Sequence, residues 1–382
     1  MKHFDIKTHI YFGENSLDRL ADIPYRNALL VADKFVVSSG LIHLITVRLQ
    51  QNEVAWQVFD DVVPDPPLEK IGLGAQAVLK QRPDVLIAIG GGSAIDSAKA
   101  IREVSLQLEP SYARPALIAI PTTSGTGTEV TSFSVVSDPE NCRKMPLVSD
   151  SMLPDEAILD AELVKSVPPS VTADTGMDVF THALESYVST NNTEFSAALA
   201  EKAIEIVGSF LLRSYLDNND THARQKMHVA SCLAGLAFNT ASLGLNHGMA
   251  HQLGSHFHIP HGRANAMLLP HIIEYNSDIS KYSRSKTEYP KHVRKYATVA
   301  RTLGLQNFNT VTTVRALSNW TQFMMKEMDM PLSISETGLC TKEEYFEQIP
   351  AMVRAALEDA CTATNPRKPT PEDVTRLYAE LW

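Results

Sequence analysis

The histidines of this chain are unevenly distributed, because six of the thirteen fall within the single run NHGMAHQLGSHFHIPHGRANAMLLPH. Residues four apart lie on the same face of an α-helix, so His247 and His251 can point at one centre, as can Asp178 and His182. His261, in the turn after HIP, adds a further imidazole. Imidazole nitrogens combined with a carboxylate favour Fe(II), Zn or Mn over Ca or Mg. The spacing therefore predicts a site for one divalent cation.

A single histidine on an apolar helix is usually a core or surface residue rather than a ligand. Two helical pairs with a third histidine cluster nearby argue against that interpretation here. For His256 and His258 we still favour a role as core or surface residues, because they alternate with Ser255 and Phe257 as in a loop or short strand. His271 follows the apolar run AMLLP, and we expect it near the site without a bond to the metal.

Length and composition limit the classes of protein to which this chain can belong. A chain of 382 residues suggests two or three domains, and 44% hydrophobic with 20% charged residues is typical of soluble globular proteins. The net charge of −10 argues against a nucleic-acid or anionic-membrane partner. The four cysteines show no paired spacing, and neither a signal peptide nor an apolar run of about 20 residues is found. We therefore expect a cytoplasmic enzyme with a small-molecule substrate.

Nearly continuous apolar runs of strand length occur at 27–33, 53–60, 84–92 and 115–123. Such runs are typical of strands buried on both faces of a parallel sheet. Segments with helical spacing lie between them, so strand and helix alternate as in a doubly wound α/β domain. We place a Rossmann-like α/β domain at 1–162.

The apolar period changes to about 3.6 residues from about Asp178 onward, as in FSAALAEKAIEIVGSFLLRSYL and ARQKMHVASCLAGLAF. Pro168 and Pro169 mark the join between the two patterns. We therefore predict an all-helical, metal-binding catalytic domain at 163–382.

Two polar loops follow predicted strands, in VLIAIGGGSAIDSAK and in PTTSGTGTEVT. Glycines allow a ligand to approach the backbone, and the helix N-terminus after GGGS offers free N–H groups to a pyrophosphate. Either loop alone is also compatible with an ordinary tight turn, but open α/β sheets bind ligands where such loops end parallel strands.

Asp33 ends the strand at 27–33 and favours NAD over NADP, since it would repel a 2′-phosphate. The acidic residue precedes the glycines, which indicates a variant of the usual dinucleotide fold.

With these residues in place, the chain resembles the iron-containing (group III) alcohol dehydrogenases over nearly its whole length. The resemblance is carried by GGGSAID, PTTSGTGTEVT, GMDVFTHALE, HGMAHQLG, IPHGRANAMLLP and CTATNPR. It implies an α/β N-terminal Rossmann-like domain plus an all-α C-terminal domain, the dehydroquinate synthase-like architecture. Within the family, PTTSGTGTEVTS and LGLNHGMAHQLG are most similar to the 1-propanol dehydrogenases of propanediol utilisation, followed by ethanolamine-utilisation and ethanol dehydrogenases.

The resemblance also implies roles for individual residues. It assigns one metal, typically iron with Zn as an alternative, to Asp178, His182, His247 and His261. His251 matches a family histidine close to the reacting centre that is not usually a ligand, and it is a candidate proton relay. The implied NAD(H) contacts are Asp33, Gly91, Gly92, Ser93, Asp96, Thr122, Thr123, Thr126, Thr131 and Lys144.

We therefore expect NAD-dependent interconversion of short primary alcohols and aldehydes, propanal/1-propanol or acetaldehyde/ethanol, by metal-assisted hydride transfer. One alternative is another activity of the family, on 1,3-propanediol, 4-hydroxybutyrate or lactaldehyde. A dehydroquinate synthase-like lyase would need several Lys and Arg side chains for its substrate, whereas the histidine region offers chiefly Arg263. A metal-binding scaffold without activity is a third hypothesis. The resemblance further implies a homodimer or larger assembly and leaves open enclosure in a bacterial microcompartment.

Overall fold

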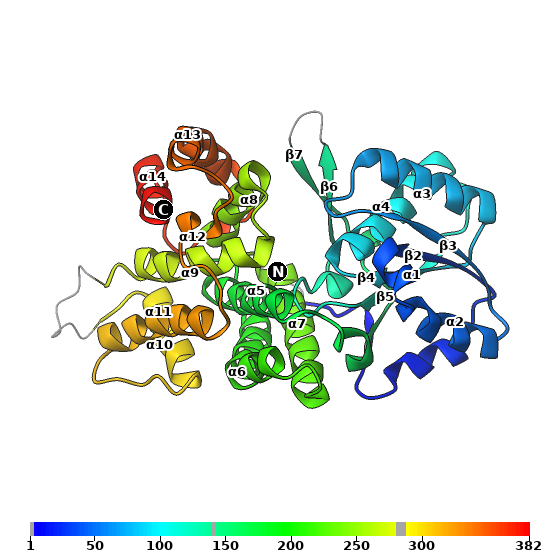
Figure 1. Ribbon diagram of the computed structural model, residues 1–382, viewed down its shortest axis with the longest axis horizontal. Coiled ribbons are helices and arrows are strands. Elements are labelled where there is room, and N and C mark those ends of the chain that lie inside the picture. The colour runs from blue at the N-terminus through cyan, green and yellow to red at the C-terminus, as the bar shows by residue number, and fades with distance from the viewer. Residues whose placement is uncertain (1–3, 139–142, 280–287) are drawn as a thin grey trace. The chain divides into compact units, whose positions relative to one another are not determined.

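The computed structural model describes residues 4–138, 143–279 and 288–382, without the side chains of 138, 143 and 144. The chain divides into two compact units, Met1–Val167 and Pro168–Trp382 (Figure 1). This division lies slightly after residue 162, where we placed the domain boundary, because Leu163 is fully buried in a core of the first unit.

A six-stranded sheet forms the centre of the first unit, in the order β1-β8-β5-β4-β2-β3. Its strands are β1 (His9–Phe12), β2 (Asn27–Asp33), β3 (Ala55–Val62), β4 (Val85–Gly90), β5 (Ala116–Pro121) and β8 (Glu156–Leu159). All neighbouring strands run parallel. The four predicted strands are confirmed as β2 to β5, with small shifts at their ends. The expected burial holds for β2, β4 and β5. It is wrong for β3, which lies at the edge of the sheet and is exposed along most of its length.

Helices cover both faces of this sheet. They are α1 (Lys34–Ser38), α2 (Leu41–Gln51), α3 (Leu68–Gln81) and α4 (Gly92–Leu108). Successive residues of a strand point to opposite faces, so Leu30 packs in a core with Ile45 of α2, whereas Leu29 packs in a core with Ile71 of α3. Figure 1 shows α2 on one side of the sheet and α3 and α4 on the other. Burial on both faces explains why β2, β4 and β5 have continuous apolar sequences.

Short elements that the sequence analysis did not predict complete the first unit. An antiparallel hairpin, β6 (Phe133–Asp138) with β7 (Arg143–Val148), follows the second polar loop. The 3₁₀ turns are η1 (Ser16–Asp22), η2 (Thr128–Val130), η3 (Asp150–Met152) and η4 (Ala161–Val164).

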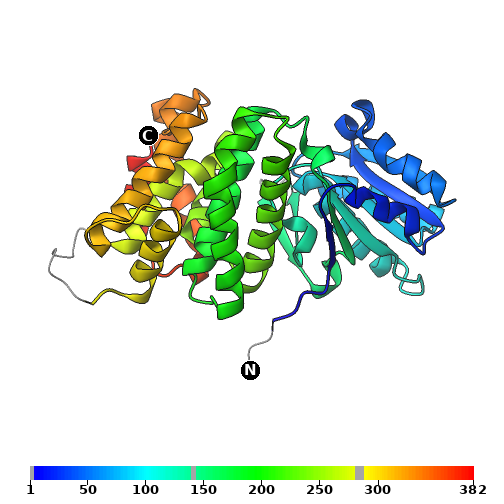
Figure 2. The same ribbon diagram turned by 90° about the horizontal axis from the view of Figure 1, so that it is seen from below.

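Helices form the second unit, which contains no strand among its described residues. They are α5 (Pro169–Val188), α6 (Glu194–Leu216), α7 (Thr221–Ala241), α8 (Leu245–Phe257), α9 (His261–Ser277), α10 (Lys291–Thr302), α11 (Thr310–Glu327), α12 (Ile334–Thr337), α13 (Lys342–Glu358) and α14 (Pro371–Glu380), with the 3₁₀ turn η6 (Thr362–Thr364). Helices α5, α6 and α7 pack side by side, in green in Figure 2. The predicted all-helical second half is confirmed.

Helix α5 is buried at nearly every position from Thr172 to Val188, and it belongs to the largest hydrophobic core of the chain. A helix enclosed on all sides by other helices can hold polar side chains away from water. Asp178, His182 and Glu185 are such side chains, each at most 5% exposed. This helix therefore forms the interior wall of the candidate site.

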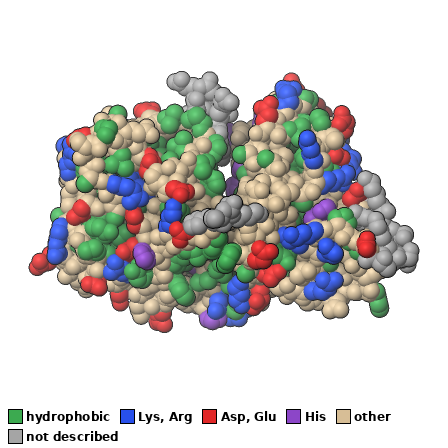
Figure 3. All heavy atoms as spheres, turned by 180° about the vertical axis from the view of Figure 1, so that it is seen from behind, with side chains coloured by type: hydrophobic (Ala, Val, Ile, Leu, Met, Phe, Trp, Pro, Cys, Tyr) green, Lys and Arg blue, Asp and Glu red, His purple; other side chains and the backbone are tan. Residues whose placement is uncertain are grey.

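The face of the molecule in Figure 3 carries acidic and basic side chains interspersed with apolar ones. Within the described residues, no helix by itself has the length and hydropathy of a membrane span. The bent pair Thr221–Ala241 and Leu245–Phe257, which meets at 108°, passes that test only when the two helices are joined.

Candidate metal centre and nucleotide-binding loops

Three helices bring the four predicted metal ligands together. Helix α5 carries Asp178 and His182, α8 carries His247, and α9 begins with His261. One donor atom from each residue lies within 4.8 Å of the other three. Asp178 Oδ1 is 3.8 Å from His247 Nε2 and 3.6 Å from His261 Nε2, and Asp178 Oδ2 is 4.0 Å from His182 Nδ1.

These separations fit a common ion better than direct hydrogen bonds. They exceed the usual hydrogen-bond length, whereas ligand atoms about 2.1 Å from one ion are roughly 3.4 Å apart in a tetrahedron. The donor set of three imidazoles and one carboxylate suits Fe(II) or Zn. The residues present therefore fit the group that the sequence predicts.

Close contact between helices α5 and α9 places His261 beside Asp178. A Cβ atom on Gly262 would lie 2.1 Å from the Asp174 carbonyl oxygen, so only glycine permits this approach. Arg263 then makes two hydrogen bonds of 3.1 Å to the Asp174 carboxylate. This bidentate ion pair fixes the first turn of α9 on α5.

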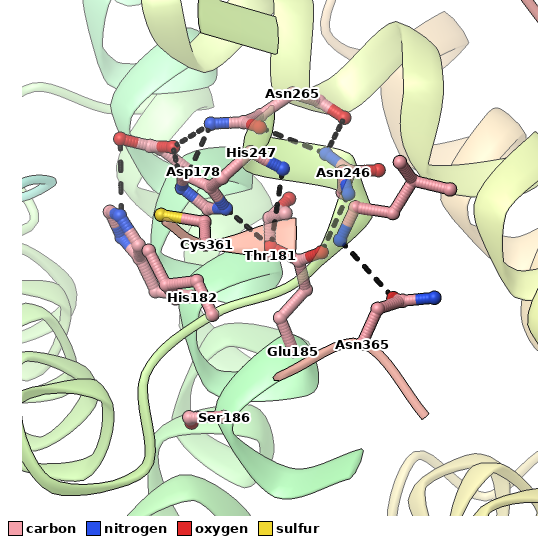
Figure 4. A network of polar contacts seen from close by, with 12 residues as sticks. Asp178, Thr181, His182, Glu185, Ser186, Asn246, His247, Asn265, Cys361 and Asn365 are labelled. Atoms are coloured by element: carbon pink, nitrogen blue, oxygen red, sulfur yellow. Dashed lines mark hydrogen bonds and ion pairs between the residues drawn. The ribbon is translucent and has the colours of Figure 1, made fainter. Parts of the chain in front are cut away.

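Two residues that the sequence analysis missed hold the ligands in place. The Asn265 amide nitrogen donates to Asp178 Oδ1 at 2.7 Å and lies 3.1 Å from the Nε2 atoms of His247 and His261. Glu185 Oε2 lies 2.5 Å from His247 Nδ1. In Figure 4 the His247 ring lies between Asn265 and Glu185. The sequence could have indicated both residues. Asn265 is four residues after His261, and Glu185 is three after His182, so each lies on the same helix face as a predicted ligand.

Burial sets the charge state of this centre in the metal-free chain. Desolvation, and then the neighbouring imidazoles of His182, His261 and His251, lower the pKa of His247 well below 6.5. Its ring is therefore neutral and has a lone pair to offer. Burial also raises the pKa of the Glu185 carboxyl to about 8, despite three backbone N–H groups that lower it. A bound cation would favour the ionised form of Glu185.

His251 lies beside these residues with a carboxylate partner of its own. Its Nδ1 atom is 2.8 Å from Asp359 Oδ2, and its ring stacks on that of His261 with centroids 5.5 Å apart. Asp359 Oδ1 also accepts from the Cys361 backbone N–H at 2.9 Å. Burial raises the pKa of the Cys361 thiol well above 9.0, so this sulfur is a protonated thiol in the metal-free chain.

The nucleotide-binding residues gather at one edge of the sheet. Strands β2, β4 and β5 are neighbours, and their carboxyl ends lead into Asp33, Gly91 and Thr122 respectively. The chain places β3 on one side of β2 and then crosses to β4 on the other. Open α/β sheets bind ligands outside such a reversal of strand order.

The two polar loops are in contact with each other. The Thr122 N–H donates to the Gly90 carbonyl at 2.9 Å. A Cβ atom on Gly91 would lie 3.4 Å from Thr123 Oγ1, and one on Gly92 would lie 2.9 Å from Thr126 Cγ2. The residues brought to this edge are Asp33, Gly91, Gly92, Ser93, Thr122, Thr123 and Thr126.

The other three predicted NAD(H) contacts, Asp96, Thr131 and Lys144, are not among the residues gathered at this edge. Asp96 accepts hydrogen bonds from Thr128 Oγ1 at 2.6 Å and from the Val135 N–H at 3.0 Å. Thr131 Oγ1 accepts from Lys99 Nζ at 3.1 Å. Asp96 and Thr131 thus help to attach the second loop to α4, and their contact with NAD(H) stays a prediction. The side chain of Lys144 lies outside the described residues.

Lys99, which the sequence analysis did not single out, is the centre of this attachment. Its side chain is fully buried, and its Nζ donates to Thr128 Oγ1 at 2.9 Å and to the carbonyl oxygens of Thr131 and Phe133 at 2.8 and 2.7 Å. Burial lowers the pKa of Lys99 to about 8. A buried lysine with several acceptors is a structural anchor.

Comparisons with known proteins agree with this fold and identify the family. The model of the iron-containing alcohol dehydrogenase family matches residues 7–161, and the model of its C-terminal part matches residues 172–382. The chain therefore belongs to the iron-containing alcohol dehydrogenase family, and it is an enzyme that interconverts alcohols and aldehydes.

Individual relatives align over the whole chain. The sequence is 41% identical to the 1-propanol dehydrogenase of Citrobacter freundii, over 100% of both proteins. The structure resembles a solved 1,3-propanediol oxidoreductase, with a TM-score of 0.89, 29% identity and 100% of both chains covered. It also resembles the sulfoacetaldehyde reductase of Bifidobacterium kashiwanohense in complex with NAD⁺, with a TM-score of 0.86 and 28% identity over 100% of this chain and 98% of that one.

Proposed function

We propose that this chain reduces short aliphatic aldehydes with NADH, and oxidises the corresponding primary alcohols, at one iron ion. Asp178, His182, His247 and His261 would hold the ion, and Zn is the alternative metal. The observation that carries this proposal is the set of four donor atoms, from three helices, that lie within 4.8 Å of one another.

Each unit of the chain has a distinct part in the proposed reaction. When bound, the metal would polarise the substrate carbonyl and the nicotinamide would supply the hydride. The loops after β4 and β5, with the N-terminus of α4, would bind the cofactor pyrophosphate. His251, with its ring oriented by Asp359 at 2.8 Å, would transfer a proton to the substrate oxygen.

The substrate we favour is propanal, with 1-propanol as the product. Identity of 41% over the whole length of a 1-propanol dehydrogenase supports this choice. Acetaldehyde is the next candidate, followed by the substrates of other family members, such as 1,3-propanediol, 4-hydroxybutyrate and lactaldehyde.

NAD(H) is the cofactor that we propose. Asp33 supports it, because a carboxylate at the end of β2 would repel the 2′-phosphate of NADP. The likeness to a reductase solved with NAD⁺ points the same way. The proposed contacts are Asp33, Gly91, Gly92, Ser93, Asp96, Thr122, Thr123, Thr126, Thr131 and Lys144.

The lyase alternative has less support. Such an enzyme would need basic side chains free to bind a phosphate or carboxylate of the substrate. Arg263, the candidate nearest to the histidines in sequence, is instead paired with Asp174 through two hydrogen bonds of 3.1 Å.

For the assembly we propose a cytoplasmic homodimer or larger oligomer. Strand β1 lies at the edge of the sheet, where unpaired backbone groups can meet a second chain. The resemblance to propanediol-utilisation enzymes also supports enclosure in a bacterial microcompartment. Co-purification with compartment shells would test the enclosure.

Aldehyde reduction by defined metal forms tests the proposed activity. Protein stripped of metal would be reloaded anaerobically with Fe(II) or with Zn, and NADH consumption would be followed with propanal, acetaldehyde and lactaldehyde. We expect turnover with the Fe(II) form and highest kcat/KM with propanal. Absence of turnover with every aldehyde, despite bound metal and NADH, would contradict the proposal.

A further inference from the structure

Glu185 of α5 lies against the first turn of α8, the helix that carries His247. Its Oε1 atom accepts from the Asn246 N–H at 2.8 Å, and its Oε2 atom accepts from the His247 N–H at 3.4 Å. The same Oε2 atom lies 2.5 Å from Nδ1 of the His247 ring. One buried carboxylate thus contacts both the backbone and the ring of a proposed metal ligand.

The backbone contacts of Glu185 cap the N-terminus of α8, whose own N-cap residue cannot do so. The N-cap residue is Gly244, which has no side chain to accept hydrogen bonds from the first turn. Glu185 and Asn365 serve instead, and Asn365 Oδ1 accepts from the Leu245 N–H at 3.1 Å. A Cβ atom on Gly244 would lie 2.6 Å from Glu185 Oε1, so glycine leaves room for the carboxylate. The cap fixes where α8 begins.

The ring contact determines which nitrogen of His247 carries the proton. Both oxygens of Glu185 already accept from backbone N–H groups, and with a cation bound the carboxylate is ionised and only accepts hydrogen bonds. His247 Nδ1 must then donate to Oε2, and Nε2 keeps a lone pair. In the metal-free chain the contact at Nε2 indicates the same tautomer, because the Asn265 amide nitrogen, a donor, lies 3.1 Å from Nε2. A bound metal would replace Asn265 as the partner of that lone pair. Asn265 is itself oriented by Asp178 Oδ1, which accepts from that nitrogen at 2.7 Å.

We infer that Glu185 is a positioning residue, which holds His247 in the tautomer that presents Nε2 to the metal while it caps α8. The inference rests on the proposed metal site. It separates Glu185 from the four ligands, since Glu185 acts on the ion only through the imidazole.

Substitution of Glu185 by Gln reverses the preferred tautomer with little change in shape. If the amide oxygen stays on the Asn246 N–H, the amide nitrogen donates to Nδ1 of His247, and the imidazole proton must move to Nε2. If the amide is flipped, its nitrogen opposes the Asn246 N–H and the cap is lost. We expect Glu185→Gln to weaken metal binding about 10- to 100-fold, the usual effect of losing such a partner.

Two control variants separate the effect on the ring from other losses. Asn365→Ala removes the acceptor of the Leu245 N–H without contact to the His247 ring. Glu201→Gln makes the same chemical change in α6, where Glu201 accepts from the Tyr187 hydroxyl. We expect both controls to bind metal as the wild type does, whatever stability they lose.

The measurement is anaerobic titration of metal-free protein with Fe(II), and with Co(II), whose ligand-field absorption reports the donor set independently of activity. Weaker binding and an altered Co(II) spectrum in Glu185→Gln alone would support the inference. Equal binding by wild type and Glu185→Gln would overturn it, as would equal weakening in Asn365→Ala. Failure of the wild type to bind one equivalent would instead refute the proposed metal site.

A second measurement needs no variant, and therefore stands if Glu185→Gln does not fold. In Zn-loaded wild-type protein with ¹⁵N-labelled histidines, nuclear magnetic resonance distinguishes the nitrogen that carries the proton. We expect a hydrogen-bonded proton on Nδ1 of His247 and none on Nε2. A proton on Nε2, with Nδ1 bound to the metal, would overturn the inference.

Discussion

Gly92, the first residue of α4, packs so closely against Thr126 of the second polar loop that a Cβ atom on Gly92 would lie 2.9 Å from Thr126 Cγ2. The two residues come from loops that follow neighbouring strands, β4 and β5. The backbone N–H groups at the start of α4 are the proposed pyrophosphate site. A side chain at position 92 would therefore push the second polar loop away from the start of α4 and change the proposed pyrophosphate site.

Gly92→Ala should weaken NADH binding roughly tenfold, because an ordinary carbon contact needs about 3.5 Å and Thr126 or α4 must move. Fluorescence titration with NADH measures the affinity. Thr126→Ser removes the opposing methyl group, and the double variant should recover most of the loss. Gly72→Ala is a matched control in α3, where an added Cβ meets nothing within 4 Å. Full NADH affinity in Gly92→Ala would refute the tight contact.

Asp33→Ser should shift the cofactor preference toward NADPH. Asp33 caps α1 by accepting from the Val36 N–H at 2.8 Å, and serine can also cap a helix. Removal of the charge ends the repulsion of a 2′-phosphate, and we expect the ratio of kcat/KM for NADPH to that for NADH to rise about tenfold or more. An unchanged ratio would show that Asp33 does not face the ribose.

His251→Ala should lower kcat roughly 100-fold at unchanged metal content, as expected for loss of a proton-transfer group. Asp359→Asn should lower it less, because the ring stays but loses its orienting carboxylate at 2.8 Å. If Asp359 acts only through His251, the double variant will be no slower than His251→Ala alone. Turnover of His251→Ala equal to wild type at every pH would eliminate the relay.

Lys99 gives a pH dependence of stability with a definite sign. Burial lowers its pKa to about 8 from 10.5, so between these values the folded chain binds fewer protons than the unfolded chain. The free energy of unfolding must then rise with pH across this window, by at most about 1.4 kcal/mol per pH unit. Lys99→Met lacks this proton, so the stability of wild type relative to Lys99→Met should increase from pH 8 upward. Urea unfolding of both proteins at several pH values measures the difference, and a constant difference would contradict the burial of a charged Lys99.

The sequence predicted the elements whose patterns are local. The apolar run of β4 and the glycines after it identify a buried strand and the start of α4, because the sheet is covered on both faces. The spacing of Asp178 and His182 likewise placed both side chains on one face of α5.

Other features depend on contacts between distant segments. Glu185 and His247 are 62 positions apart, and Asn365 caps α8 from 120 positions away. The charge of Lys99 suggests a surface residue, and only the acceptors of the second loop explain its burial. The β6–β7 hairpin is short and mixed in polarity, so its strands lack a clear apolar period.

The most direct test of a single metal centre is the stoichiometry of bound iron, measured together with propanal reduction, in wild type and in His261→Ala. His261 is the most exposed of the four proposed ligands, with 40% of its side chain accessible, so its loss should leave the fold intact. We predict one Fe(II) per wild-type chain, and in folded His261→Ala both a large loss of bound iron and a parallel loss of turnover. Iron content and turnover in His261→Ala equal to those of the wild type would contradict the proposed centre.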